Sequence, residues 1–298
     1  MRYSLCLSYD GATFCGWQIQ PSAPSVQAAL EAALSRLLNH PVAVTGAGRT
    51  DTAVNAVNYV AHFDWDGPLP FEASDFTYKL NAILPRSVVV HEVLPVADDF
   101  HARFSAKRRE YTYFIHRQKD PFVAPWSWQC GYPELDFDAM NQACRHLLGT
   151  HDFSCFEKTG TDNKTSVCTV FEAYWKPYTP THIQVMGSGS IGPGACAPPH
   201  KGRGRGPLPQ AVGGAGVERS ETEFPGPVLP EPGDYWYFRI AADRVLRNMV
   251  RATVGSLIEV GRGKHAPEWI AQLIATGTRG DAGESVPGNA LFLNSVRY

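Results

Sequence analysis

The sequence predicts an α+β fold of two similar halves, in which mostly antiparallel sheets carry helices on one face and a central cleft lies between the halves. Two observations predict this fold. Strand-like and helix-like segments alternate along the 298 residues, and apolar residues make up 44% of the chain, as expected for a protein with a buried core. We expect an N-terminal half over residues 1–105 and a C-terminal half over residues 106–298.

The N-terminal half begins with Arg2–Tyr9, whose apolar and polar residues alternate as in a strand. Ser25 is a typical helix N-cap residue and precedes an apolar stripe at helical spacing. That stripe consists of Val26, Leu30, Ala33, Leu34, Leu37 and Leu38. The remaining elements of this half are expected as strands at Val42–Val44, Val57–Phe63 and Val88–Leu94, the last ending at Pro95, and as a helix at Phe76–Leu84.

The C-terminal half repeats this alternation of strands and helices. Phe137–Leu148 has the spacing of a helix, with Met140, Ala143, Leu147 and Leu148 facing inward. Further helices are expected at Val245–Val260 and Glu268–Ile274, and strands at Tyr111–His116, Val167–Tyr178, Ile183–Met186, Tyr235–Ile240 and Leu291–Val296.

One segment, Gly187–Gly233, interrupts the pattern. It holds 12 of the 27 glycines and 9 of the 23 prolines, so it buries too little apolar surface to offset its chain entropy. We expect a disordered insertion in a hairpin between Ile183–Met186 and Tyr235–Ile240. Its Lys201–Gly206 stretch resembles an arginine–glycine RNA-binding tract, although an inert low-complexity insertion is the interpretation we favour.

Composition excludes several classes of protein. Seven cysteines without a Cys-x-x-Cys pair argue against a disulfide framework and against a structural zinc site. No apolar run approaches the length of a membrane helix, and the strand-like N-terminus lacks the features of a signal peptide. We therefore expect a cytoplasmic protein that is not associated with a membrane.

The distribution of charge indicates a polyanionic ligand. The net charge is only −2, but residues 101–117 hold five Arg or Lys against one acid, and residues 239–264 hold six against two. Local basic stretches on a nearly neutral protein suit a polyanion such as nucleic acid. Charge alone equally fits two ordinary solvated faces.

The stretch Gly46–Ala53 is the strongest candidate for a functional site, because it presents Asp51 in a glycine turn beside Arg49, between two strands. The alternatives are a tight turn, a helix cap or a dinucleotide-binding turn. The dinucleotide reading is weak, since the third glycine of that fingerprint would fall at position 51, where a carboxylate would repel the pyrophosphate. The link from Asp51 to the next strand is also too short for a crossover helix.

Four patterns occur in order along the chain: Tyr9-Asp10-Gly11 with Gly16-Trp17-Gln18; Gly48-Arg49-Thr50-Asp51; Phe100–Ala106 with Tyr111; and Asn248-Met249-Val250-Arg251. In this order and spacing the chain resembles the TruA type of tRNA pseudouridine synthase. The resemblance covers nearly the whole chain except Gly187–Gly233. It includes His151-Asp152-Phe153, Val254–Leu257 and the closing Leu291-Phe292-Leu293.

The resemblance implies isomerisation of uridine to pseudouridine at positions 38–40 of the tRNA anticodon arm, with no cofactor and no metal. It also implies a homodimer with tRNA as its partner. Asp51 matches the catalytic aspartate of the family, which acts on C1′ either as a nucleophile or through a glycal-like route. Arg251 matches the arginine paired with it, as expected for a carboxylate kept charged in a dry pocket. Helical spacing would align Arg251 with Arg244 and Arg247 in one stripe.

The resemblance further implies that Tyr111 is the active-site tyrosine, stacking on the flipped uracil and helping to move a proton. Tyr113 shares its strand face and is an equal candidate by spacing alone. Arg49 is expected to contact the target nucleotide. The residues expected to bind the tRNA backbone are Arg103, Lys107, Arg108 and Arg109.

The chain departs from the family pattern after Asp51, where Thr52-Ala53-Val54-Asn55 stands in place of the common Ala-Gly-Val-His. Loss of the glycine at position 53 removes freedom for a positive φ, so we expect the turn to be built differently. Glu110 also stands where a basic residue often precedes the tyrosine. The alternative functions are a catalytically inactive tRNA-binding protein or RNA chaperone, and a nucleotide-dependent dehydrogenase.

Overall fold

The computed structural model describes residues 1–160, 164–187 and 233–298. Contacts divide the chain into a large unit, Met1–Tyr178 with Pro232–Tyr298, and a second unit, Thr179–Glu231. The described part of the second unit contains helix α4 (Thr181–Gly187), so the strand expected at Ile183–Met186 is wrong. Backbone N–H groups of Ile183 and Gln184 donate to the carbonyl of Pro180, which favours the helical turn. The disorder expected for Gly187–Gly233 falls almost wholly outside the described residues.

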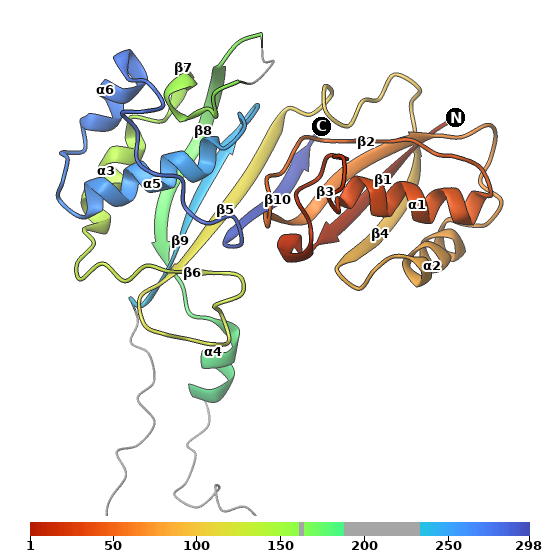
Figure 1. The fold of residues 1–298 in the computed structure, drawn as a ribbon, viewed down its shortest axis with the longest axis horizontal. Coiled ribbons are helices and arrows are strands. Elements are labelled where there is room, and N and C mark those ends of the chain that lie inside the picture. The colour runs from red at the N-terminus through yellow and green to blue at the C-terminus, as the bar shows by residue number, and fades with distance from the viewer. Residues whose placement is uncertain (161–163, 188–232) are drawn as a thin grey trace, which may run out of the picture. The chain divides into compact units, whose positions relative to one another are not determined.

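The large unit is an α+β structure with a mostly antiparallel ten-stranded sheet, as the sequence predicts (Figure 1). Its main path runs β4-β1-β3-β10-β5-β9-β8-β7, with β2 paired to β3 and β6 to β5. Two pairs, β10 with β3 and β6 with β5, are parallel. The strands are β1 (Arg2–Tyr9), β2 (Val44–Gly46), β3 (Asn55–Asp64), β4 (Val88–Val96), β5 (Arg108–His116), β6 (Trp128–Gln129), β7 (Gly149–Asp152), β8 (Val167–Pro177), β9 (Tyr235–Ala242) and β10 (Leu291–Arg297).

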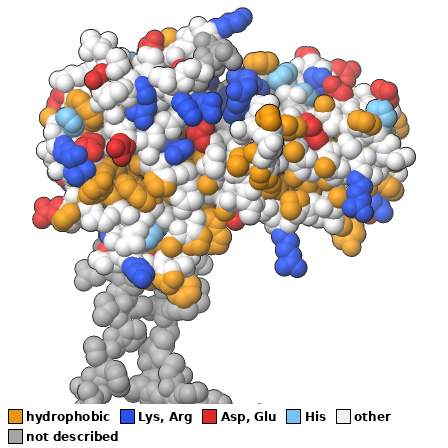
Figure 2. All heavy atoms as spheres, viewed as in Figure 1, with side chains coloured by type: hydrophobic (Ala, Val, Ile, Leu, Met, Phe, Trp, Pro, Cys, Tyr) orange, Lys and Arg blue, Asp and Glu red, His pale blue; other side chains and the backbone are white. Residues whose placement is uncertain are grey.

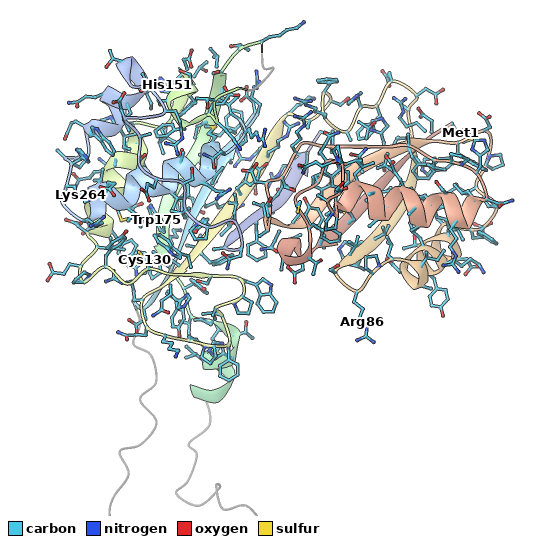
Figure 3. The ribbon with its side chains drawn as sticks, in the orientation of Figure 1. Met1, Arg86, Cys130, His151, Trp175 and Lys264 are labelled. Atoms are coloured by element: carbon cyan, nitrogen blue, oxygen red, sulfur yellow. The ribbon has the colours of Figure 1, made fainter. Side chains whose placement is uncertain are left out.

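Helices pack at both ends of this sheet. At the β4 end, α1 (Val26–Leu38) contacts α2 (Ala73–Ile83), which packs on β4; at the other end, α3 (Phe137–Arg145) packs on β8 and on α5 (Met249–Gly261), beside α6 (Trp269–Thr276) (Figure 1). Two 3₁₀ turns, η1 (Gly11–Thr13) and η2 (Ser154–Phe156), complete the described elements of this unit. Trp175 of β8, labelled in Figure 3, is buried, and its ring packs against those of Phe137 in α3 and Phe238 in β9.

The helix boundaries follow from local capping chemistry. The Ser25 side chain accepts a hydrogen bond from the Ala28 N–H, which confirms the predicted N-cap of α1. Asp136 caps α3 in the same way through the Ala139 N–H. Because α3 ends at Arg145, Leu148 leaves the helical period and is exposed, so its predicted inward position is wrong.

Two strand predictions are corrected by the pairing of the sheet. Strand β4 continues through Pro95 to Val96, because β4 lies at the sheet edge, where a missing N–H costs no ladder bond. The hairpin predicted between Ile183–Met186 and Tyr235–Ile240 is also wrong. The partner of β9 is β8, and the two strands pair antiparallel from Val170↔Ala242 to Pro177↔Trp236. The Tyr178 N–H donates to the Tyr235 carbonyl at 3.0 Å, which extends this ladder by one residue beyond Pro177.

Strand β10 joins the first part of the chain to the rest of the sheet. Its Leu293 pairs with Ala56 of β3 on one side and with Tyr111 of β5 on the other. Since β3 begins four residues after Asp51, this register brings the Asp51 loop close to Tyr111. Residues from both halves of the sequence therefore meet around β10.

Candidate active site

The loop that carries Asp51 connects β2 to β3 and packs closely against the chain after β1. The Trp17 N–H donates to the Thr50 carbonyl at 3.2 Å. Gly16 has a φ of +96°, and a Cβ there would lie 2.3 Å from that carbonyl oxygen. Glycine at position 16 is therefore required for the two loops to touch, which explains the Gly16-Trp17-Gln18 pattern.

A buried cluster of aromatic side chains packs against the loop that carries Asp51. Tyr9, Trp17 and Tyr59 are buried, and the rings of Trp17 and Tyr59 stack with centroids 4.2 Å apart. The Tyr9 hydroxyl lies 2.9 Å from Thr50 Oγ1, while the Tyr59 hydroxyl accepts the Gly48 N–H at 3.2 Å and donates to the Gly48 carbonyl. Burial raises the pKa of both tyrosines, so these hydroxyls keep their protons and hold the loop by hydrogen bonds.

The turn after Asp51 is closed by a hydrogen bond from the Val54 N–H to the Asp51 carbonyl at 3.2 Å. Ala53 adopts a φ of +63°, in the left-handed region that favours glycine. The expectation that loss of glycine at position 53 changes the turn is therefore wrong in one respect. The positive φ is present, and an alanine carries its strain.

Asn55 ties this loop to two other segments. Its buried side-chain amide accepts the Gly11 N–H at 2.9 Å through Oδ1 and donates to the Asn289 carbonyl at 2.7 Å through Nδ2. An amide makes both bonds without titrating near neutral pH. Asn55 therefore has a structural role at the position where the family commonly has histidine.

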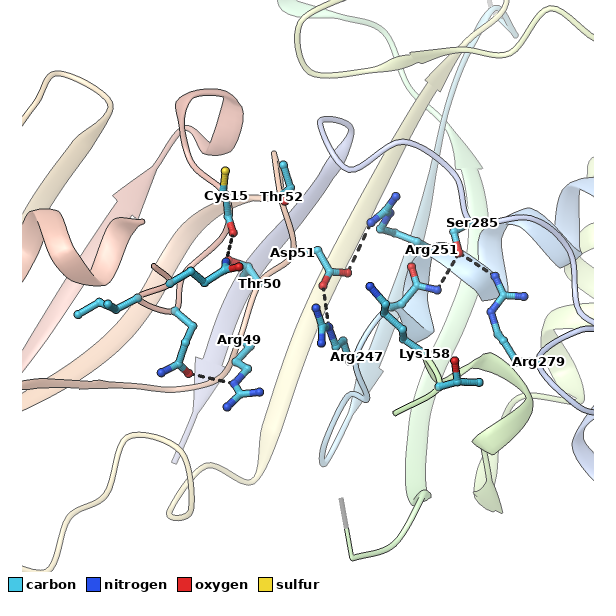
Figure 4. A pocket seen from close by; sticks show the side chains of 15 residues that line it. Cys15, Arg49, Thr50, Asp51, Thr52, Lys158, Arg247, Arg251, Arg279 and Ser285 are labelled. Carbon is cyan, nitrogen blue, oxygen red and sulfur yellow. Dashed lines mark hydrogen bonds and ion pairs between the residues drawn. The ribbon is translucent and has the colours of Figure 1, made fainter. Parts of the chain in front are cut away.

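Two arginines face the Asp51 carboxylate (Figure 4). Arg251 Nη1 lies 3.5 Å from Oδ2 and Arg247 Nε lies 3.8 Å from Oδ1; the Asp51 side chain is 23% exposed. The predicted helix over Val245–Val260 begins only at Met249, so Arg247 lies before the helix rather than in a helical stripe with Arg251. The sequence prediction placed Arg247 in a stripe with Arg251 but not among the site residues. Its contact with Asp51 comes from the segment before the helix, which helical spacing does not describe.

A second set of contacts fixes the position of Arg251. Its Nε donates to the Val286 carbonyl at 2.6 Å. The loop that carries Val286 is held by Ser285, whose Oγ accepts from Asn248 Nδ2 at 2.7 Å and from Arg279 Nη2 at 2.8 Å. Figure 4 shows the contact of Arg279 with Ser285 and that of Arg251 with Asp51. Arg251 thus reaches Asp51 as part of a connected polar network.

Two cavities of about 750 Å³ each share Arg49, Thr50, Asp51, Arg247, Asn248 and Arg251 in their walls. The first is mostly polar and includes Gln18, Lys158, Thr159, Arg279 and Ser285. The second has a larger apolar share and includes Val54, Phe104, Tyr111, Leu246, Met249 and Leu291. Figure 2 shows Lys and Arg side chains gathered near the middle of this face of the molecule. Asp51 is therefore an acid in strongly basic surroundings.

The two tyrosines of β5 occupy different environments. Tyr111 is 7% exposed and lines the second cavity, whereas Tyr113 is fully buried and lines neither cavity. The Tyr113 hydroxyl has no hydrogen-bond partner among the described residues. Burial, opposed by Arg109 and assisted by the charge of Asp51, raises the pKa of Tyr111 to about 12. Tyr111 is thus a neutral hydroxyl close to the carboxylate.

The predicted RNA-binding residues lie in three kinds of surroundings. Arg49 and Arg103 are exposed and line cavities, and Arg49 Nε donates to Gln18 Oε1 at 2.9 Å. Lys107 is exposed but lines neither cavity. The other two have protein partners: Arg108 pairs with Glu110 at 2.8 Å and with Glu172, and buried Arg109 donates to the carbonyls of Ala47, Arg103 and Asp243.

Glu110, which replaces a basic residue of the family pattern, is a buried carboxylate shared by Arg108, Arg239 and Arg297. These three arginines and their hydrogen bonds keep the pKa of Glu110 below its usual range despite the opposing effect of burial. The three guanidinium groups therefore surround one anion within the sheet. The departure at position 110 is accommodated by charge pairing.

Among the described residues, no group of three or more His, Cys, Asp or Glu side chains is arranged to hold a metal ion. No helix in the part of the chain that the structure describes is long and apolar enough to cross a membrane.

Comparison with known proteins gives the chain a family. A family model described as tRNA pseudouridine synthase matches residues 143–298. Three proteins named tRNA pseudouridine synthase A are similar to this chain over its full length. Those from Parabacteroides distasonis, Porphyromonas gingivalis and Bacteroides fragilis are 37%, 38% and 38% identical to this chain, respectively. Each comparison covers 100% of this chain and 96%, 97% and 96% of those relatives, respectively. With Asp51, Arg251 and Tyr111 gathered around one cavity, this chain belongs to the tRNA pseudouridine synthase family, among the synthases A.

Proposed function

We propose that this protein isomerises uridine to pseudouridine at positions 38–40 in the anticodon arm of tRNA, using Asp51 and no cofactor. One observation carries the proposal: the Asp51 carboxylate is faced by Arg247 and Arg251 where two cavities meet. Full-length relatives named tRNA pseudouridine synthase A support the same reaction and substrate.

The two cavities suit different parts of a nucleotide. The second cavity offers Tyr111, Val54 and Leu291, which are suitable neighbours for a flipped uracil ring. The first offers Lys158, Arg279 and Arg49, which suit the phosphates on either side of it. In this arrangement the ribose C1′ lies between base and phosphates, beside the Asp51 carboxylate.

The reaction is an isomerisation in which no electrons are gained or lost overall. The N1–C1′ bond breaks, the uracil turns, and C5 forms the new bond to C1′ before it loses its proton. N1 gains a proton. Asp51 acts on C1′ as a nucleophile or assists a glycal-like route, and the guanidinium groups of Arg247 and Arg251 face its carboxylate.

Tyr111 is the residue we assign to the uracil ring and to proton movement. Because burial raises its pKa to about 12, its hydroxyl is protonated at neutral pH. It therefore serves as a hydrogen-bond donor or proton relay rather than as a phenolate base. Arg49, Arg103 and Lys107 are exposed cations suited to the RNA backbone. Arg108 and Arg109 would contribute by fixing their neighbours, given their protein partners.

The wider organisation is part of the proposal. We divide the protein into an N-terminal half over residues 1–105 and a C-terminal half over residues 106–298, with the catalytic cleft between them. A cytoplasmic homodimer is proposed as the working form. Half-buried aromatic residues on one face of β5, β8, β9 and β10 support an association surface: Phe114, Tyr174, Tyr237 and Phe292. Sedimentation equilibrium of the purified protein tests the dimer.

The reaction is tested with unmodified tRNA carrying tritium at uridine C5, in buffer with a chelator and without added nucleotide. The native protein should release tritium, because C5 loses its hydrogen when it becomes the glycosidic carbon. Asp51→Asn should release none while binding tRNA within about tenfold of the native protein, since phosphate contacts dominate affinity. Retained turnover in Asp51→Asn would refute the assignment of Asp51. Binding without release by the native protein would instead select an inactive tRNA-binding protein.

A further inference from the structure

One exposed aromatic side chain lies at the cavity where we expect the uracil. Phe104 is 75% exposed and lines the second cavity together with Asp51 and Tyr111. Single exposed apolar side chains are common on protein surfaces and need no explanation by themselves. Among the exposed aromatic side chains of the described residues, Phe104 alone borders a cavity that also contains the candidate catalytic carboxylate.

The backbone that carries Phe104 is a tight turn built around His101. The imidazole Nδ1 of His101 accepts the N–H groups of Arg103 and Phe104, at 3.1 and 3.3 Å. The Ser105 hydroxyl accepts the His101 N–H at 3.0 Å, and the Ser105 N–H donates to the His101 carbonyl at 2.9 Å. The backbone under the exposed ring is therefore held by local hydrogen bonds on both sides.

Residues from other elements fix the same turn from outside. His62 of β3 accepts the Ala102 N–H at 3.1 Å, and the Tyr298 hydroxyl donates to the Ala102 carbonyl at 2.8 Å. Buried Arg109 donates both to the Arg103 carbonyl at 2.6 Å and to the Ala47 carbonyl at 3.1 Å. Since Ala47 belongs to the loop that carries Asp51, Arg109 fixes the Phe104 turn relative to the carboxylate.

The charge beside the ring favours an anionic aromatic ligand. The guanidinium carbon of Arg103 lies 5.5 Å from the centre of the Phe104 ring. An aromatic face beside a cation is the combination that binds single-stranded nucleic acid, where the ring stacks on a base and the cation neutralises its phosphate. A rigid backbone reduces the ordering cost of such binding.

We propose that Phe104 is a stacking platform for an unpaired nucleobase of the RNA, next to the uridine that enters the Asp51 cavity. The proposal rests on the proposed function and adds a second base-binding position to it. It assigns to Phe104 a contribution to RNA affinity through its ring face. The Phe104 ring takes no part in the bond changes at C1′.

The first test compares the rate constant kcat/KM for tritium release among variants of Phe104. Phe104→Ala should lower it by about 5- to 150-fold, the range expected for loss of one base–aromatic stack. Phe104→Tyr, which keeps the ring, should stay within about threefold of the native kcat/KM. Phe104→Leu keeps the apolar bulk but not the ring, so its kcat/KM should fall nearly as far as that of Phe104→Ala. The matched control is Tyr78→Ala, because Tyr78 on α2 is 76% exposed and lines neither cavity.

The second test identifies the stacked base. Anticodon-arm RNAs are made with one abasic nucleotide at a time around the target uridine. At the stacked position, the abasic loss and the Phe104→Ala loss should be non-additive, as for two partners of one contact. A 2-aminopurine at that position should be quenched by the native protein and not by Phe104→Leu.

Three results would overturn the stacking platform: native activity in Phe104→Ala, equal activity of Phe104→Leu and the native protein, or additive losses at every abasic position. Each of these requires that the native protein releases tritium. Absence of release by the native protein would count against the proposed function itself, so the two failures are distinguishable.

Discussion

Arg251 Nη1 lies 3.5 Å from the Oδ2 of Asp51, while Nε of the same guanidinium donates to the Val286 carbonyl at 2.6 Å. One planar group thus holds the carboxylate and the loop on its far side together. Lysine cannot reproduce both contacts, because its ammonium is a single point charge on a flexible stem. Arg247 has a longer contact, 3.8 Å, and a side chain that is 45% exposed.

This difference predicts unequal effects of lysine at the two positions. Arg251→Lys should lower kcat by at least about tenfold, whereas Arg247→Lys should stay within about threefold of the native value, because exposed ion pairs contribute little. Single-turnover tritium release measures the rates, and filter binding of tRNA separates them from affinity. Equal losses in both variants would contradict the geometric distinction.

The surroundings of Tyr111 and Tyr113 predict opposite results for the same substitution. Tyr111→Phe removes a protonated hydroxyl from the cavity and should lower kcat by about 10²-fold, the low end for loss of a group that moves a proton. Tyr113→Phe removes a buried hydroxyl that lacks a partner among the described residues, so activity should be unchanged and stability equal or higher. Rate measurements and urea unfolding check both. A larger rate loss in Tyr113→Phe would reverse the assignment.

The positive φ of Ala53 predicts that glycine stabilises the protein at this position. Alanine in the left-handed region costs about 1–2 kcal/mol, and glycine loses about 0.5–1 kcal/mol more conformational entropy on folding than alanine does. Ala53→Gly should therefore raise the free energy of unfolding by about 0.5–1 kcal/mol. Ala29→Gly, in the interior of α1, is the control and should lower it by about 1 kcal/mol. A loss of stability in Ala53→Gly would show that strain at this turn is negligible.

The lowered pKa of the buried His62 imidazole predicts that acid destabilises the fold. Burial, with the nearby charges of Arg2 and His101, lowers the pKa of His62 to about 4 from its ordinary value of 6.5. Between these two values the unfolded chain binds more protons than the folded chain, so the free energy of unfolding falls as pH falls through this window. The full loss, below the folded pKa, is on the order of 3 kcal/mol.

Urea unfolding at pH 7 and pH 5 measures this effect. His62→Asn keeps an acceptor for the Ala102 N–H but does not titrate, so its stability should depend less on pH than that of the native protein. His40→Asn replaces an exposed imidazole and serves as the control. The same pH dependence in the native protein and in His62→Asn would exclude His62 as its source.

The buried hydrogen bonds of Asn55 predict that its replacement by alanine destabilises the protein more than the same replacement of an exposed asparagine. Asn55→Ala leaves the buried Gly11 N–H without its partner and should cost about 1–3 kcal/mol of unfolding free energy. Asn58→Ala removes an exposed hydrogen bond to the Asn294 carbonyl and should cost about 0.5 kcal/mol or less. Thermal and urea unfolding compare the two variants. Similar losses would show that burial of the Asn55 amide is unimportant.

The sequence alone predicted most of the secondary structure, because strand alternation, helical spacing and the Ser25 cap are local properties of the chain. Its glycine turn singled out Asp51, and the resemblance to the TruA type of synthase added Tyr111 and Arg251 as site candidates. Its errors occurred where local signals are ambiguous. The short apolar run Ile183–Met186 fits a strand or a helix. Pro95 lacks a backbone N–H, so it ends a strand only where that position must donate to a neighbouring strand.

The tertiary structure decided the contacts around Asp51. The register of Leu293 between β3 and β5 separates Tyr111, which lines the cavity, from Tyr113, which is buried. Packing of the loops forces a positive φ on Ala53 and brings Arg247 beside the carboxylate. These outcomes depend on which distant segments meet and at what register. Local periodicity carries no information about either, so the sequence by itself determined the elements and the candidate residues, while only the assembled sheet determined their mutual geometry.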